Sequence, residues 1–297
     1  MPAKSRRAVL IGEAMLELSQ DGALWRMAYG GDTLNTAIHL ARSGVDTSYL
    51  TALGTDPFSA GVKAQWAAEG LGTSLILTHP ARNPGLYAIT CDDAGERSFT
   101  YWRGGSAACA LFDCAGIEAA LECVENADAL AFSLISLAIL PESGRLALLE
   151  LARKVRAKGG LVAFDGNYRP RLWPDRETAQ AVRDIAVAVA SIGLPTLEDE
   201  NMLSGESDAA AVAAHWQGLG CSETIVKMGA QGCRLPDGTI LAPGEVLKLV
   251  DTSGAGDAFN AGYLGARLRG EPVAQAAIAG HVLAGWTIMR RGAIPPR

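Results

Sequence analysis

Short apolar runs alternate with amphipathic stretches along most of the chain. Residues 8–12 form an apolar run that predicts a buried first strand. Leu34, Ala37, Ile38 and Ala41 then recur at the spacing of one helical face, in a helix that Asp32 or Thr33 could cap and Gly44 would end. Further strands are expected at 47–53, 73–77, 129–134, 161–164, 191–194 and 224–226, and further helices at 56–69, 116–125, 141–158 and 176–189. This alternation predicts parallel βαβ units with helices on both faces of one sheet.

Two segments break the alternation. Strand-like runs at 15–18 and 25–29 predict one hairpin, and runs at 86–91 and 97–103, joined by a turn at 92–96, predict another. We expect these hairpins to form a small second sheet that acts as a lid. The predicted fold is therefore α/β: a single doubly wound domain over residues 1–297, with a mostly parallel sheet flanked by helices and lid segments at about 13–31 and 85–106.

Composition narrows the class of partner. The formal net charge of −6 and the pI near 5.3 argue against nucleic acid or an anionic membrane surface. The six cysteines show no paired spacing of the kind that binds zinc. The longest apolar run, 129–140, ends at Pro141 and is too short to span a membrane, and residues 8–11 are too few for a signal peptide. We expect a soluble cytoplasmic protein.

Residues 246–257 carry the clearest chemical signal. A short β-type segment at 246–250 is followed by two glycines and then by an apolar-patterned helix. The backbone N–H groups of Gly254, Ala255, Gly256 and Asp257 should converge at the helix N-terminus, where the helix dipole favours an anion such as phosphate. Asp257, in the first turn, could accept the proton of an alcohol that attacks that phosphate. The pattern predicts phosphoryl transfer to a hydroxyl group, and the chain contains no P-loop string.

The string Asp-Thr-Ser-Gly-Ala-Gly-Asp at 251–257 resembles the C-terminal signature of the ribokinase-like (phosphofructokinase-B) sugar kinases. In that family the second aspartate is the catalytic base. The resemblance implies a ribokinase-like fold, ATP and Mg²⁺ as cofactors, and catalytic roles for Asp257 and for the amides of Gly254, Ala255 and Gly256. By the same resemblance, a monovalent cation such as K⁺ is possible near Asp251 and residues 290–293.

Other blocks are similar to the 2-keto-3-deoxygluconate kinases within this family, namely 12–18, 30–36, 84–87, 95–103, 165–173 and 291–295. This similarity implies ATP-dependent phosphorylation of 2-keto-3-deoxy-D-gluconate at its 6-hydroxyl. The alternatives are a fructokinase, a kinase for the galactonate epimer or another ribokinase-like sugar kinase. A non-catalytic sugar-acid-binding protein is a further alternative.

The expected substrate carries a carboxylate, which a guanidinium can bind through two hydrogen bonds. Arg103 and Arg169 are the candidates, the alternative for each being an ordinary structural ion pair. Tyr87 and Tyr101 would form a flat wall with hydroxyl groups. The resemblance adds Gly31 and Asn35 as contacts to substrate hydroxyls.

The nucleotide side is predicted from a second set of residues. Residues 226–233 resemble the family's Lys-x-Gly-x-x-Gly block, which places Lys227, Gly229 and Gly232 near ATP together with Thr252, Gly254 and Gly256. Lys227 could instead form a surface ion pair. Residues 196–200 occupy the place of the family's Asn-x-x-Glu motif, so Asp199 or Glu200 would serve Mg²⁺ through water. The lid further suggests a homodimer formed through it.

Overall fold

The computed structural model describes residues 6–91, 97–244 and 248–297. Its centre is a sheet of seven strands: β1 (Arg7–Ile11), β4 (Asp46–Leu53), β5 (Ile76–Thr78), β8 (Ala129–Ser133), β9 (Leu161–Asp165), β10 (Ile192–Gly193) and β11 (Glu223–Thr224). The strands pair in parallel in the order β11-β10-β9-β8-β1-β4-β5. Strand order therefore reverses between β1 and β8, and ligands of open parallel sheets bind at the carboxyl ends of strands near such a point.

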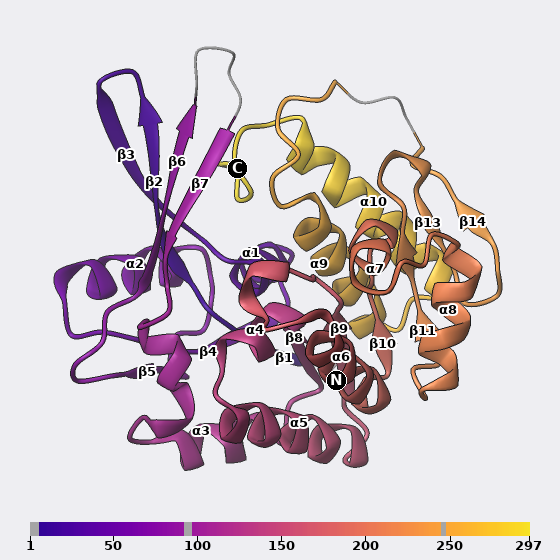
Figure 1. The fold of residues 1–297 in the computed structure, drawn as a ribbon, viewed down its shortest axis with the longest axis horizontal. Helices are drawn as coiled ribbons and strands as arrows, with labels where there is room; N and C mark the ends of the chain where they lie inside the picture. The colour runs from indigo at the N-terminus through magenta and orange to yellow at the C-terminus, as the bar shows by residue number, and fades with distance from the viewer. Residues whose placement is uncertain (1–5, 92–96, 245–247) are drawn as a thin grey trace, which may run out of the picture.

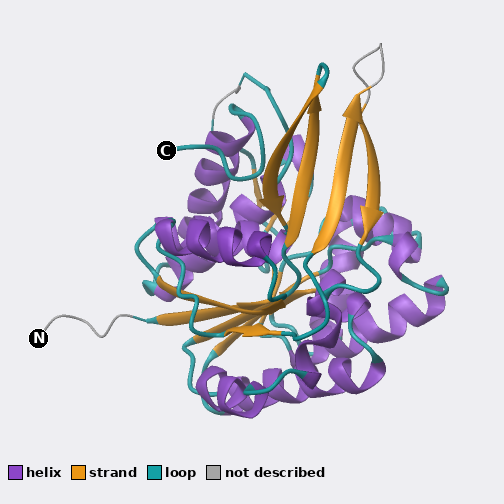
Figure 2. Cartoon of the chain, turned by 90° about the vertical axis from the view of Figure 1, so that its left-hand side faces the viewer, coloured by secondary structure: helices purple, strands orange, loops and turns teal. Residues whose placement is uncertain are grey.

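Helices cover both faces of this sheet, as Figures 1 and 2 show. One face is covered by α1 (Asp32–Arg42), α2 (Pro57–Ala68), α9 (Ala255–Leu268) and α10 (Val273–Ile288). The other is covered by η1 (Ala107–Asp113), α3 (Ile117–Val124), α4 (Leu134–Ile139), α5 (Glu142–Ala157), α6 (Arg176–Val189), α7 (Leu197–Ser204) and α8 (Ala209–Gly218). In the described part of the chain, no helix is long and apolar enough to cross a membrane.

The apolar strands follow from this double coverage. Val9 and Ile11 of β1 pack into the core on the α5 side, whereas Ala8 and Leu10 pack into the core beneath α1 and α9. Successive side chains of a strand point to opposite faces, so a strand buried on both faces must be apolar at every position. The predicted doubly wound α/β fold is confirmed.

Several predicted boundaries were wrong, for local reasons. The helix α1 is preceded by Gly31 as its N-cap, without a side-chain cap from Asp32 or Thr33. The strand predicted at 129–134 is β8, which ends one residue earlier, at Ser133, because Ser133 and Ser136 form a reciprocal capping box that starts the short helix α4. Residues 248–250 are not a strand, and 246–247 lie outside the described residues. The sequence reading also missed α7 and α8.

A second sheet projects from the body of the molecule, at the upper left of Figure 1. It consists of β2 (Met15–Asp21), β3 (Leu24–Gly30), β6 (Gly85–Cys91) and β7 (Arg97–Trp102), in the order β3-β2-β6-β7. We call it the lid sheet. Each predicted hairpin forms, and the two join through parallel pairing of β2 with β6. The predicted turn at 92–96 lies outside the described residues.

A third, three-stranded sheet follows the central one in sequence. It contains β12 (Val226–Lys227), β13 (Cys233–Arg234) and β14 (Ile240–Leu241), with the short helix η3 (Gly229–Gln231) between the first two. β13 and β14 pair antiparallel on either side of the turn at 236–238. Gly229 and Gly232 both have positive φ, 58° and 90°. A Cβ on Gly232 would overlap the carbonyl oxygen of Leu241, whereas one on Gly229 would meet open space.

We predict that Gly232→Ala destabilises the protein far more than Gly229→Ala. Both alanines incur the left-handed backbone penalty of about 1–2 kcal/mol, but only Gly232→Ala adds a clash with the neighbouring strand. Urea unfolding of the two variants measures the difference in unfolding free energy. Equal losses would mean that Gly232 is not required by the packing of β14.

Candidate active site

One large pocket lies between the lid sheet and the carboxyl ends of the central strands. Its volume of about 2370 Å³ exceeds that of an ordinary small-molecule site, about 300–1,000 Å³, and leaves room for two substrates. The pocket is lined by β2, β6 and β7 of the lid sheet, by the segment 165–172 after β9, by the start of α7, by residues 251–257 and by residues 291–293. The position agrees with the strand-order reversal in the central sheet.

Residues 254–257 form the floor of this pocket at the start of α9. Gly254 is the N-cap, with φ 70° and ψ 10°, and a Cβ there would lie 2.6 Å from Cβ of Ala293. Only glycine therefore fits at this turn. The amide of Ala255 donates to the carbonyl oxygen of Thr252 at 3.2 Å, so one of the four N–H groups expected to be free is already bonded. Gly256 and Asp257 lie in the first helical turn, where backbone N–H groups have no partner within the helix.

Asp257 accepts two hydrogen bonds from the helix α1, which packs beside α9 on the same face of the sheet. Nδ2 of Asn35 donates to Oδ2 of Asp257 at 2.8 Å, and the Thr36 hydroxyl donates to the carbonyl oxygen of Asp257 at 3.2 Å. Removal from water, with the nearby charges of Asp32 and Asp165, raises the pKa of Asp257 to about 8, against the lowering effects of Asn35 and Lys227. A carboxyl with such a pKa in a pocket is suited to proton transfer.

Lys227 and Asp165 form a polar cluster behind Asp257. The Lys227 ammonium is buried and donates to Oδ2 of Asp165 at 3.2 Å and to Oδ1 of Asn260 at 3.1 Å, and Nδ2 of Asn260 donates to the same Asp165 oxygen at 2.6 Å. The pairing of Lys227 is thus internal, not at the surface. It also lies beside the start of α9, since a Cβ on Gly256 would be 3.7 Å from its Nζ.

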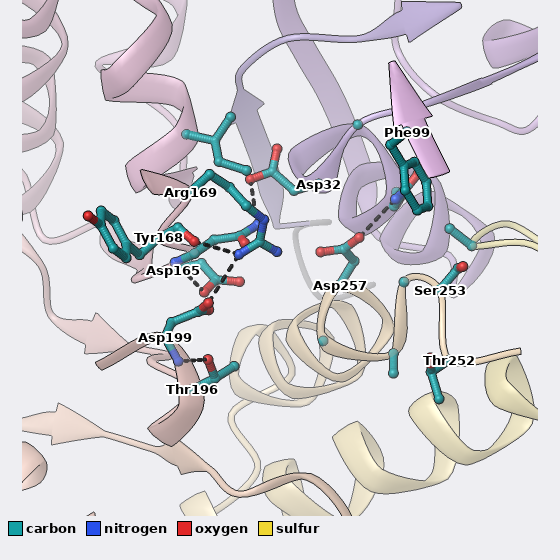
Figure 3. Close-up of a pocket in the computed structure, with 18 of the residues that line it drawn as sticks. Asp32, Phe99, Asp165, Tyr168, Arg169, Thr196, Asp199, Thr252, Ser253 and Asp257 are labelled. Atoms are coloured by element: carbon teal, nitrogen blue, oxygen red, sulfur yellow. Dashed lines mark hydrogen bonds and ion pairs between the residues drawn. The ribbon is translucent and has the colours of Figure 1, made fainter. Parts of the chain in front are cut away.

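The two arginines expected to bind a carboxylate both line the pocket, and both already have an acidic partner. Nη1 of Arg169 donates to Oδ1 of Asp199 at 3.0 Å and to the Tyr168 carbonyl oxygen at 2.7 Å. Nη2 of Arg103 lies 2.5 Å from Oε2 of Glu13. Figure 3 shows Arg169 and Asp257 facing the same space from opposite sides.

Tyr87 and Tyr101 stand opposite each other on β6 and β7, with ring centroids 5.8 Å apart, and form the expected aromatic wall. The Tyr87 hydroxyl donates a short hydrogen bond to Glu17. Burial, and then the charge of Glu17, raise the pKa of Tyr87, which keeps its hydroxyl protonated. Gly31 and Asn35 also line the pocket, and their contacts to substrate hydroxyls stay a prediction.

Of the two acids considered for magnesium, only Asp199 lines the pocket. Its amide donates to the Thr196 hydroxyl, which caps α7, and burial raises the pKa of its carboxyl against the opposing effect of Arg169. Glu200 points elsewhere: it accepts a short hydrogen bond from Arg183 and another from Nε1 of Trp216 at 3.1 Å. Within the described residues, no group of three or more His, Cys, Asp or Glu side chains could hold a metal ion.

Some of the residues expected to bind the nucleotide line the pocket, and one does not. Lys227, Gly229 and Thr252 line the pocket, and Gly232 does not, since its place in the structure is the packing of β14. Asp251 accepts hydrogen bonds from the amides of Ser253 and Gly292, both at 3.0 Å, and so ties the C-terminal segment to the start of α9. The K⁺ site expected near this contact stays a prediction.

Sequence reasoning did not single out three carboxylates that shape the pocket: Glu13, Asp32 and Asp165. A signal existed for Asp165, because it is the last residue of β9 and side chains at carboxyl ends of parallel strands converge. For Glu13 and Asp32 the sequence signal is weaker. Each lies where the chain passes between the lid sheet and the central body, and the residues that it contacts are far away in the sequence.

Comparison with known proteins agrees with the geometry. The chain is 42% identical to the 2-dehydro-3-deoxygluconokinase of Escherichia coli (strain K12), over 99% of this chain and 98% of the relative. It is 43% identical to the 2-dehydro-3-deoxygluconokinase of Dickeya dadantii (strain 3937), over 98% and 97%. The crystal structure of a PfkB protein from Polaromonas sp. JS666 superposes with a TM-score of 0.83 at 28% identity, covering 96% of each chain.

A family model described as pfkB family carbohydrate kinase matches residues 6–297. That match spans the lid sheet, the central sheet and the Asp257 turn. The chain therefore belongs to the pfkB family of carbohydrate kinases.

Proposed function

We propose that the protein transfers the γ-phosphoryl group of ATP to the 6-hydroxyl of 2-keto-3-deoxy-D-gluconate. The products are ADP and 2-keto-3-deoxy-6-phosphogluconate. The observation that carries the proposal is that one pocket holds Asp257 at a helix N-terminus together with the guanidinium groups of Arg103 and Arg169. The names of the relatives described above support the choice of substrate.

Asp257 acts as the general base. Its carboxylate accepts the proton of the 6-hydroxyl as the oxygen of that hydroxyl attacks the γ-phosphorus in line. The hydrogen bond from Asn35 fixes one carboxylate oxygen and leaves the other for the substrate. Because Asp257 belongs to the first turn of α9, the base and the anion-binding amides are parts of one rigid element.

The N-terminus of α9 stabilises the charge on the transferring phosphoryl group. The amides of Gly254 and Gly256 supply donors, and the positive end of the helix dipole adds to them. Ala255 contributes to the shape of the turn through its bond to Thr252. Gly254 permits close approach, because a side chain there would collide with Ala293.

The sugar acid lies against the lid sheet. Arg103 and Arg169 bind its carboxylate, Tyr87 and Tyr101 provide the flat wall, and Gly31 and Asn35 contact its hydroxyl groups. Closure of the lid sheet over the sugar would exclude water and suppress hydrolysis of ATP.

The remaining part of the pocket takes ATP. Lys227, Gly229 and Thr252 line this side, and Asp199, which also lines the pocket, would hold Mg²⁺ through water. Mg²⁺ retains several waters and needs few carboxylates, so one pocket-lining acid is a sufficient anchor. The bound ion would neutralise charge on the phosphate oxygens.

We also propose that the protein forms a homodimer through the lid sheet. The sheet face turned away from the pocket carries Met27, 51% exposed, and Trp102, 58% exposed, beside the exposed Trp25 at the end of the hairpin. Apolar groups this exposed are commonly covered by a partner. Light scattering should give a dimer mass that Trp102→Glu converts to a monomer, and a monomeric wild-type protein would rule out the proposal.

Coupled ADP release with Mg-ATP tests the proposed substrate. Presented with 2-keto-3-deoxygluconate, its galactonate epimer, gluconate and fructose, the protein should turn over the first most efficiently, because only an acid uses both arginines. Activity on fructose alone would retain Asp257 and the α9 N-terminus but remove the role of the arginines. ATP-dependent turnover of none of them would favour a sugar-acid-binding protein.

The pH dependence of the reaction should report Asp257. The base works as its carboxylate, which is present above its pKa, so kcat/KM should rise about tenfold per pH unit and level off above pH about 8. Asp257→Asn should lower kcat by about a hundredfold to ten thousandfold while the protein stays folded. A variant with near-normal turnover would exclude Asp257 as the base.

Asp32→Asn provides the matched control for this profile. The charge of Asp32 raises the pKa of Asp257, so its removal should move the rising limb of the profile toward lower pH. Asparagine retains an oxygen that can accept the hydrogen bond from Asn167. A limb that does not move would mean that it belongs to another group.

A further inference from the structure

Glu13 is a buried carboxylate at the point where the chain leaves the central sheet for the lid sheet. It lies between β1 and β2 and is only 2% exposed. Burial raises the pKa of its carboxyl, and the Arg103 charge and the Ser106 hydrogen bond oppose that effect. A carboxylate this deeply buried needs such partners to remain charged.

Glu13 touches each of the four places where the chain crosses between the central body and the lid sheet. It forms part of the first crossing itself, and its carbonyl oxygen occupies the space that a Cβ on Gly31 would need at the second. At the third crossing, its Oε1 would lie 2.8 Å from a Cβ on Gly85. At the fourth it contacts Arg103 and Ser106. Glu13 thus touches all four crossings, the second through its backbone carbonyl oxygen and the third and fourth through its carboxylate.

The contacts at the fourth crossing hold Arg103 by one end. Oε2 of Glu13 lies 2.5 Å from Nη2 of Arg103, and the Ser106 hydroxyl donates to Oε1 at 2.5 Å. Nε of Arg103 is buried and has no hydrogen-bond partner among the described residues. A guanidinium has five N–H donors, so contact with Glu13 through one terminal nitrogen leaves others for a ligand oxygen that approaches Arg103 from the pocket, which Arg103 lines.

The two pocket arginines differ in how firmly they are held. The Arg169 side chain is 51% exposed and its partner Asp199 lies on the pocket wall, whereas the Arg103 side chain is 13% exposed and that of Glu13 is 1% exposed. If Arg103 left Glu13, it would strand a buried charge, which is costly. A ligand carboxylate must therefore share the Arg103 guanidinium with Glu13, because it cannot displace Glu13.

We propose that Glu13 is a positioning residue that fixes the Arg103 guanidinium and the lid crossings for recognition of the carboxylate of the sugar acid. The inference rests on the proposed function, in which Arg103 binds that carboxylate. Fixing a long side chain before the substrate arrives removes an entropic cost from binding and sets the angle of the guanidinium. A buried carboxylate behind the pocket lining thus promotes binding of an anion, through the cation that it orients.

Steady-state kinetics of Glu13→Gln, Arg103→Lys and the double variant test this inference. Glu13→Gln should raise KM for 2-keto-3-deoxygluconate on the order of tenfold, with kcat and the KM for Mg-ATP changed about twofold or less. Arg103→Lys should raise the same KM, since an ammonium lacks the planar fork. The double variant should be little worse than the more damaged single variant, because the two residues act as a unit.

Glu69→Gln is the matched control. Glu69 pairs with Arg42 at 2.6 Å, with side chains 27% and 8% exposed, outside the pocket. This variant should lower the midpoint of thermal unfolding without changing either KM. If Glu69→Gln raises the KM for the acid as much as Glu13→Gln does, the effect is one of general stability and the inference is wrong.

The remaining outcomes separate the inference from the proposed function. No effect of Arg103→Lys on the KM for the acid would remove the role of Arg103, and the inference with it. An effect of Arg103→Lys with none from Glu13→Gln would overturn the inference alone.

If Glu13→Gln fails to fold, Ser106→Ala provides the test. This variant removes one hydrogen bond to Glu13 and should raise the KM for the acid about two- to threefold. An unchanged KM would contradict the inference.

Discussion

Asp257 lies partly buried at the start of α9, on the wall of the pocket and within range of the charges of Asp32 and Asp165. A carboxyl group placed there beside Asp32 and Asp165 is uncharged over much of the neutral range, because burial and like charges raise its pKa to about 8. Asn35 and Lys227 oppose this rise in the pKa of Asp257. Asn35 belongs to α1 and Lys227 to β12, and the side chain of each forms a hydrogen bond to a side chain of α9. The doubly wound fold serves to bring these groups to one edge of the sheet.

Each of three positively charged side chains that line the pocket is paired with a carboxylate. Arg103 is paired with Glu13, Arg169 with Asp199 and Lys227 with Asp165, in a protein whose formal net charge is −6. Two anionic substrates must therefore share or displace carboxylates that the protein already holds against its cations. The three pairs differ in how exposed the cation is. The Arg169 side chain is half exposed, whereas the Lys227 and Arg103 side chains are 9% and 13% exposed. Rearrangement on binding is thus easiest at Arg169 and most costly at the buried pairs.

The sequence was most informative where the chemistry is local. Residues 251–257 could be interpreted as an anion-binding turn with a base, because glycines, a capped helix start and Asp257 all fall within one turn. The alternation of strands and helices predicted the parallel sheet. The helix predicted at 176–189 is α6, and the structure shows the side chain of Asp175 capping its start by accepting a hydrogen bond from the amide of Thr178.

What could not be predicted depends on tertiary contacts. Asn35 and Asp257 lie 222 positions apart, and Glu13 and Ser106 lie 93 apart, so neither hydrogen bond leaves a pattern in a single sequence. Gly232 was assigned to the nucleotide because its motif is shared with a binding loop, yet its observed role is to allow close packing against Leu241. Glu200 was a candidate for magnesium by proximity to Asp199, but Arg183 and Trp216, brought in by α6 and α8, take its oxygens.

Infrared difference spectroscopy of the carboxyl groups as a function of pH, wild type minus Asp257→Asn, measures the protonation state of Asp257. In the absence of substrates, we expect a protonated carboxyl band that belongs to Asp257 and converts to carboxylate around pH 8. Conversion below about pH 5, near the ordinary range of an aspartate, would contradict this expectation, because Asp257 would then be a solvated carboxylate that neither burial nor its acidic neighbours perturb.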